Sequence, residues 1–188
     1  MLKRISAFLF KRQVMKMTHS SDRERSFVNY KKAKSVFLLF ESDFTEKNAV
    51  IRKIIQVLQL YRKKVVAWGF LDKKQLTTAL LPDFRVLNYE HTDFFHRPHS
   101  SFFRELEHYE FDLVIDLTLN SILPLDYFVL FSKAKCKIGV KKTDLPIYDF
   151  IIDLENHQQT LESSEEELDE LFLFNQIIFY LKSIQSSD

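Results

Sequence analysis

Residues 111–120 read FDLVIDLTLN, and this stretch decides the fold class. Its central part, DLVIDL (112–117), is a nearly unbroken apolar run, which is typical of a strand covered on both faces of a parallel sheet. SVFLLF (35–40) is a second run of the same kind. Because such strands need a packed layer on each side, the two runs predict an α/β domain.

Further strands and helices alternate around these two runs. Four more strands are expected, and helical spacing indicates helices between them and at both ends. Right-handed crossovers then predict a Rossmann-like three-layer sandwich with a mostly parallel six-stranded sheet in the order 3-2-1-4-5-6. The other expected strands are 65–70, 85–89, 135–140 and 148–154, and the expected helices are 1–17, 50–61, 72–80, 100–109, 123–133 and 164–184.

Length and composition set the domain organisation. A chain of 188 residues with 46% hydrophobic residues suits one compact core. We divide it into a basic N-terminal helical segment, 1–34, and a single Rossmann-like domain, 35–188. The lone Cys136 lies in an apolar run, so it is expected to be a core residue rather than half of a disulfide.

Charge is unevenly distributed although the net charge is only +1. Residues 1–34 carry ten Lys or Arg and two acids, whereas residues 149–188 carry ten acids and one base, Lys182. The simplest interpretation is two solvated faces. Two alternatives are that the termini attract each other, or that the basic segment contacts an anionic partner.

The N-terminus has no pattern of a signal peptide or a membrane-spanning helix. The apolar stretch 5–10 is too short and is followed at once by Lys11 and Arg12. We therefore expect a cytoplasmic protein, with residues 1–17 able to make peripheral contact with a membrane surface. No nucleic-acid-binding motif is present, so nucleic acid is not an expected partner.

Glycine is scarce where a nucleotide-binding sheet would need it. Gly69 and Gly139 are the chain's only glycines, and neither follows the first strand. The usual phosphate-binding turn is replaced by Glu41, Ser42 and Asp43, so no nucleotide cofactor is expected.

Four polar residues are candidates for ligand binding because each follows an expected strand: Asp43, His91, Asp116 and Asn120. Each also has a structural explanation. Asp43 and Glu46 have capping-box spacing, and Asp116 and Asn120 could fix the turn into the next helix. No catalytic residue is assigned, because the sequence holds no nucleophile elbow, Walker loop or Cys-x-x-Cys pair.

Two further groups of residues are possible binding sites. His91, Asp93, His96 and His99 match no standard metal spacing, so an ordinary polar loop is favoured and no metal is expected. Lys142 and its neighbours after the fifth strand would suit either an anion or a solvated loop.

The stretches FDLVIDLTLN (111–120) and FSKAKCKIGV (131–140) resemble the N-terminal domain of heptosyltransferase-type glycosyltransferases. The whole chain also resembles a short uncharacterised protein family found in Bacteroidetes, through RSFVNYKKAKSV (25–36) and DLVIDLTLN. The transferases place a glycine and a catalytic aspartate after the first strand. Here that position reads FESDFTE (40–46), where only Asp43 approximates the base, and we expect the sugar-nucleotide domain to be missing.

These observations favour a non-enzymatic α/β domain that acts by contacts with a protein partner or with itself. The alternative is a glycosyltransferase-like or nucleotide-binding remnant with a ligand pocket at the carboxyl ends of the strands. A further alternative is a binder of membranes or nucleic acid through the basic N-terminus. An open cleft at the strand ends that contains Asp43 and Asp116 would favour the ligand, and a plugged edge would favour the interaction platform.

Overall fold

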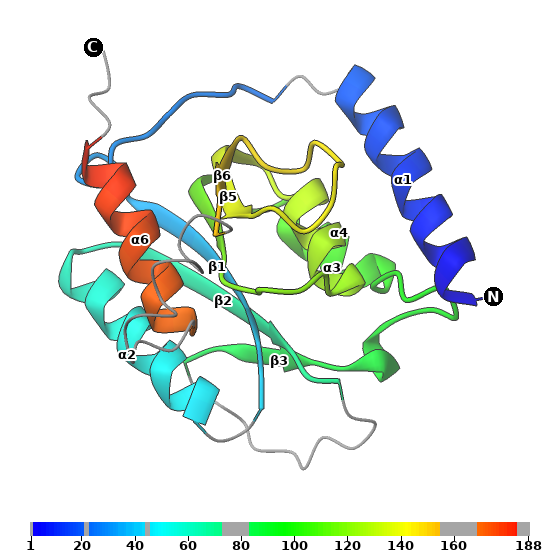
Figure 1. The fold of residues 1–188 in the computed structure, drawn as a ribbon, viewed down its shortest axis with the longest axis horizontal. Helices are drawn as coiled ribbons and strands as arrows, with labels where there is room; N and C mark the ends of the chain where they lie inside the picture. Colours follow the sequence, from blue (N-terminus) through cyan, green and yellow to red (C-terminus); the bar gives the residue numbers. More distant parts are fainter. Residues whose placement is uncertain (1, 21–22, 44–45, 73–82, 155–168, 184–188) are drawn as a thin grey trace.

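The computed structural model describes residues 2–20, 23–43, 46–72, 83–154 and 169–183. Its centre is a six-stranded sheet in the order β3-β2-β1-β4-β5-β6, with every neighbouring pair parallel. The predicted α/β class and strand order are therefore confirmed (Figure 1). The strands are β1 Ser35–Glu41, β2 Lys64–Phe70, β3 Arg85–Leu87, β4 Phe111–Asp116, β5 Ala134–Val140 and β6 Phe150–Ile152.

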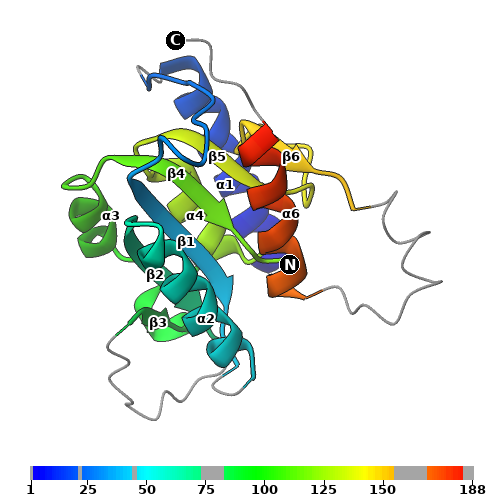
Figure 2. The same cartoon turned by 90° about the vertical axis from the view of Figure 1, so that its left-hand side faces the viewer.

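Helices cover both faces of the sheet (Figures 1 and 2). Val36, Leu38 and Phe40 of β1 belong to the core shared with α2 and α6, while Phe37 and Leu39 belong to the core shared with α1, α3 and α4. This division follows from the alternation of side chains along a strand. The helices are α1 Leu2–Ser20, α2 Glu46–Leu60, α3 Ser100–Leu106, α4 Leu123–Phe131 and α6 Glu170–Ser183, with a short 3₁₀ helix, η1, at Tyr89–His91.

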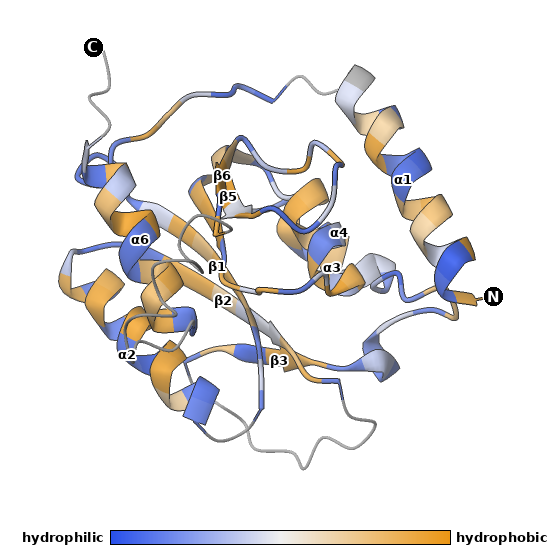
Figure 3. Cartoon of the chain, in the orientation of Figure 1, coloured by the Kyte–Doolittle hydropathy of each residue, from blue (hydrophilic) through white to orange (hydrophobic). Residues whose placement is uncertain are grey.

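The hydropathy of the helices agrees with this layering. Figure 3 shows apolar residues over most of α4, which is buried along most of its length, and apolar residues mixed with polar ones on α2 and α6. In α2 the buried apolar side chains recur at helical spacing, at Ile51, Ile54, Ile55 and Leu58. Their burial on the sheet supplies most of the stability of such a helix.

Strands β1 and β4 lie side by side, but their chains continue on opposite faces of the sheet. The chain leaving β1 reaches α2 on one face, and the chain leaving β4 reaches α4 on the other. The loops therefore diverge at the carboxyl ends of these two strands. In open α/β sheets, such a switch point is where ligands usually bind.

Two predicted strands are too long, and one predicted helix cannot be judged. The third strand was expected over 85–89 but ends at Leu87, because the Asn88 side chain accepts the Glu90 N–H and starts η1. The expected helix over 72–80 falls largely on 73–82, outside the described residues. The sixth strand is likewise shorter than expected, covering Phe150–Ile152.

The two glycines serve close packing of aromatic rings. A Cβ built on Gly69 would lie 2.5 Å from the Phe40 ring, and one on Gly139 would lie 2.6 Å from the Tyr148 ring. Both glycines lie within strands, β2 and β5, and neither has a positive φ. Their role is therefore to let a neighbouring ring lie directly on the strand.

Candidate functional site

Asp116, the last residue of β4, is fully buried and has both carboxylate oxygens occupied. Its Oδ1 accepts the backbone N–H and the hydroxyl of Thr118, at 2.9 and 2.7 Å. Its Oδ2 accepts Lys142 Nζ and Tyr148 OH, each at 2.6 Å. The carboxylate is thus held by the loops that follow β4 and β5.

Lys142 and Tyr148 close this network. The Lys142 side chain is 1% exposed, and its Nζ also donates to Thr118 Oγ1 and to Tyr148 OH. Burial, and then the charge of Asp116, raise the pKa of Tyr148 well above its usual value, so the phenol keeps its proton. The network is therefore a closed, structural arrangement.

A second buried carboxylate, Asp126, lies in the first turn of α4. Its Oδ2 accepts the Ser121 hydroxyl at 2.5 Å, whereas its Oδ1 is buried without a hydrogen-bond partner among the described residues. Burial raises the pKa of Asp126 to about 7. Lys142 opposes that rise and Asp116 adds to it, which places the three groups in one electrostatic neighbourhood.

A cleft of about 390 Å³ lies at the carboxyl edge of the sheet, next to this network. It is bounded by the ends of β1 and β2, the loops after β3 and β4, and the first turns of α1. Its volume falls in the range of small-molecule sites. The polar lining residues are Lys3, Ser6, Glu41, Asp72, Tyr89, His96, Asn120 and Ser121, and the apolar wall is formed by Ala7, Phe70, Ile122, Leu123 and Pro124.

His96 is an unusual feature of the cleft. Its backbone has φ 62°, in the left-handed region that few residues other than glycine adopt. Its ring packs edge-on against Tyr89 at 4.8 Å, and its Nδ1 is buried without a partner among the described residues. Strained backbone and unpaired buried polar atoms concentrate at functional sites.

The acidic groups of the cleft have neighbours that hold them in place. Glu41 Oε2 accepts Lys47 Nζ at 2.8 Å. Asp72 interacts with the Tyr89 hydroxyl and, after burial, contributes to raising the pKa of that phenol. The carboxylates of Glu41 and Asp72 thus face the cleft from the ends of two neighbouring strands.

Of the four candidates from the sequence, Asn120 lines the cleft. Asp116 lies behind it in the buried network, and Asp43 Oδ2 accepts the Lys47 N–H at 3.3 Å near the start of α2. His91 Nδ1 lies 2.7 Å from Asn88 Oδ1 in the capping box of η1, and burial lowers the pKa of this histidine. All four candidates therefore lie near the carboxyl edge of the sheet, but they do not line one common cleft.

Several lining residues were not assigned as site residues from the sequence. Glu41 is the last residue of β1, and Asp72 and Ser121 follow β2 and β4 by a few residues, so that position was the signal that could have identified them. Lys142 is also explained by the strand order, because β5 lies next to β4 and its following loop reaches Asp116.

The histidine-rich loop is organised by local hydrogen bonds. Asp93 Oδ1 accepts the N–H groups of Phe95 and Arg97, and His99 Nε2 lies 3.1 Å from the Glu90 carbonyl oxygen. Within the described ranges, no three His, Cys, Asp or Glu side chains converge so as to hold a metal ion.

A cavity of about 460 Å³ lies at the opposite edge of the sheet, around the amino ends of β4 and β5. The buried Lys137 lines it and donates from Nζ to the Leu130 carbonyl oxygen at 2.9 Å. That bond satisfies a carbonyl in the last turn of α4, which explains the lysine structurally. The cleft at the carboxyl edge is therefore the stronger candidate site.

A protein-family model covers most of this chain. The model of a family described as "Family of unknown function (DUF6913)" matches residues 7–183. The search of curated proteins found no match. The resemblance to heptosyltransferase-type enzymes stays a prediction.

Proposed function

Since the chain belongs to DUF6913, a family of unknown function, we propose its role from its own geometry: a small-ligand-binding α/β domain. The ligand occupies the cleft at the carboxyl ends of β1, β2 and β4. The observation that carries the proposal is this cleft of about 390 Å³ at the switch point, with the unpartnered His96 Nδ1 in its lining.

The lining favours a hydroxyl-rich molecule of the nucleoside or sugar class. Carboxylates such as Glu41 and Asp72 accept hydrogen bonds from hydroxyl groups. Tyr89, which is partly exposed, offers aromatic surface for a sugar ring or a base. A phosphate suits the cleft less well, because it would face these carboxylates without a glycine-rich turn to bind it.

The buried network around Asp116 supports ligand binding without catalysis. The carboxylate at the end of β4 is the natural position for a general base in this fold. Here Asp116 is fully buried and hydrogen-bonded through both oxygens, so it is not free to accept a proton from a ligand. This supports a domain that recognises its ligand without using Asp116 as a base.

The competing function is an interaction platform, a domain that acts only by contacts with a protein partner or with itself. This function predicts a plugged edge at the carboxyl ends of the strands. The edge holds a cleft, which supports the ligand, but the cleft is lined by Asn120 and not by Asp43 or Asp116 as the ligand-pocket hypothesis expected. The platform also predicts that no small molecule changes the stability of the isolated chain, which makes the two functions separable in one experiment.

The experiment is a thermal unfolding screen of the full chain with adenosine, uridine, galactose, adenosine monophosphate and inorganic phosphate. A ligand selective for the native state raises the free energy of unfolding, by about 2.7 kcal/mol at 100 times its Kd. The melting temperature rises as a result. We expect a rise with a nucleoside or a sugar. Stabilisation by inorganic phosphate alone, or by none of the compounds, would contradict the proposal.

Variants locate the binding. Asn120→Ala and Asp72→Asn remove polar groups from the cleft without touching the core, and each should raise the Kd about tenfold. Glu107→Gln is the matched control, since this exposed residue lies at the end of α3, outside the cleft lining. Equal affinity in all three variants would place the ligand elsewhere.

A further inference from the structure

Helix α1 presents large apolar side chains to solvent. Ile5, Phe8 and Met15 are 43, 65 and 54% exposed. They lie on one side of the helix, because 100° per residue brings these positions within about 80° of one another. The opposite side contains Phe10 and Val14, which are buried against the body of the protein, so the outward apolar residues are not required for packing α1.

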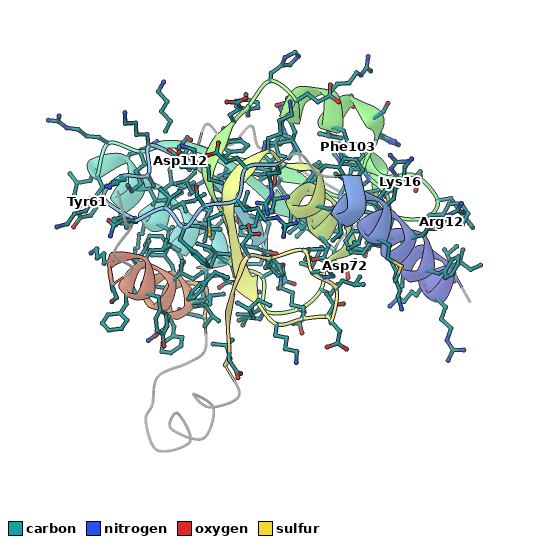
Figure 4. All side chains as sticks on the ribbon, turned by 90° about the horizontal axis from the view of Figure 1, so that it is seen from above. Arg12, Lys16, Tyr61, Asp72, Phe103 and Asp112 are labelled. Carbon is teal, nitrogen blue, oxygen red and sulfur yellow. The ribbon has the colours of Figure 1, made fainter. Side chains whose placement is uncertain are left out.

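Basic side chains surround the outward apolar residues. The sequence of α1 contains no acidic residue. Figure 4 shows α1 at the periphery of the molecule, with Arg12 and Lys16 on it. The basic residues of the helix are Lys3, Arg4, Lys11, Arg12 and Lys16.

We propose that this outward face of α1, defined by Ile5, Phe8 and Met15 and by the basic residues Arg4, Lys11, Arg12 and Lys16, docks the protein on an anionic membrane surface. The helix lies in the plane of the interface. Its apolar side chains enter the boundary between headgroups and acyl chains, and its bases meet anionic headgroups. Each Lys or Arg close to such a surface contributes about 1 kcal/mol.

The composition of the face favours a lipid surface over nucleic acid. Phosphate contacts require basic groups alone, and they would leave Phe8 and Met15 in water. An anionic interface accommodates both the charge and the apolar side chains. Among the described residues, no helix is long and apolar enough to cross a membrane, so contact through α1 would be confined to the surface.

The outward face of α1 does not line the cleft, but it lies next to it. Lys3, Ser6 and Ala7 from the first turns of α1 line the cleft, while Ile5 and Phe8 are on the outward face. A docked protein would therefore hold its cleft close to the membrane surface.

The test is sedimentation of the full chain with vesicles of phosphatidylcholine, alone or mixed with phosphatidylserine, at low and high salt. We expect binding to the mixed vesicles only, with weaker binding at high salt because the surface charges are screened. Equal binding to both vesicle types, or none to either, would overturn the proposal. Tighter binding to a DNA duplex than to the mixed vesicles would also overturn it.

Two double variants separate the apolar and the basic contributions of the face, and a third variant serves as the control. Phe8→Ser/Met15→Ser removes apolar contact, and Arg4→Gln/Arg12→Gln removes charge. Each should lower the vesicle affinity at least tenfold while leaving the melting temperature unchanged, because the replaced side chains are exposed. Phe179→Ser on α6, where the ring is 63% exposed, is the control and should bind as the parent does. Loss of binding in that control alone would reject docking through α1.

Discussion

Lys142 and Asp116 form a buried ion pair at the carboxyl edge of the sheet, with 2.6 Å between Nζ and Oδ2 and side chains 1 and 0% exposed. The pair joins the loop after β5 to the end of β4. An ammonium and a carboxylate removed from water are stable there only because each compensates the other and the Tyr148 and Thr118 hydroxyls complete the bonding. The strand edge beside the cleft is therefore held by charge as well as by apolar packing.

Removal of one partner from this pair should be costly. Lys142→Met leaves the Asp116 carboxylate buried without its cation, and we expect the free energy of unfolding to fall by about 3–5 kcal/mol. Urea denaturation measures the loss. Lys141→Met is the matched control, since the Lys141–Asp144 side chains are 64 and 98% exposed and the loss there should stay below about 0.5 kcal/mol. Similar losses in the two variants would refute the role given to Lys142.

Asp126 should make the protein less stable as the pH rises. Its pKa is about 7 in the folded chain against 3.8 as the ordinary value, so between these two pH values the native state binds the additional proton. The contribution is most favourable below the lower value and is lost as pH rises through about 7. Asp126→Asn should remove this dependence and be the more stable protein at pH 8, by up to about 4 kcal/mol.

Urea unfolding of the parent and the Asp126→Asn variant from pH 4 to pH 8 gives the comparison directly. The difference between their unfolding free energies should change steadily over this window. Parallel pH curves would mean that Asp126 is ionised at its ordinary pKa and that the buried carboxylate is solvated.

Gly139→Ala should disturb the Asp116 network through the ring of Tyr148. The added Cβ would meet the Tyr148 ring at 2.6 Å, and the ring cannot easily move because its hydroxyl donates to Asp116. We expect a loss of about 1–3 kcal/mol in unfolding free energy. Thermal unfolding followed by circular dichroism measures it, with the exposed Ser101→Ala as control. An unchanged melting temperature for Gly139→Ala would show that Tyr148 moves freely.

The sheet was predictable because its strands are continuous apolar runs. Val36 to Phe40 and Leu113 to Ile115 are all fully buried, so burial on both faces left a clear signal in the sequence. The end of β3 was not predictable in the same way. The hydrogen bond that the Glu90 N–H donates to the Asn88 side chain decides it, and hydrophobic periodicity carries no information on such a bond.

The cleft was only partly predictable, because its walls come from distant parts of the chain. Asn120 could be identified since it follows β4 at the switch point. Ser6 could not, because nothing in the sequence states that α1 packs with its first turns at the carboxyl edge. For Asp116 the sequence position suggested a ligand that the structure does not require. Lys142, from the loop after β5, donates to its carboxylate and gives Asp116 a structural partner instead.

The most direct test of ligand binding in the cleft is a heteronuclear NMR titration of the 22.5 kDa chain. The titrant is the nucleoside or sugar that raises the melting temperature most. We expect the amide signals of Glu41, His96, Asn120 and Ser121 to shift together and saturate with one Kd, because these residues line a single cleft. Shifts confined to the surroundings of Lys137 at the opposite edge, or no shifts at all, would contradict this expectation.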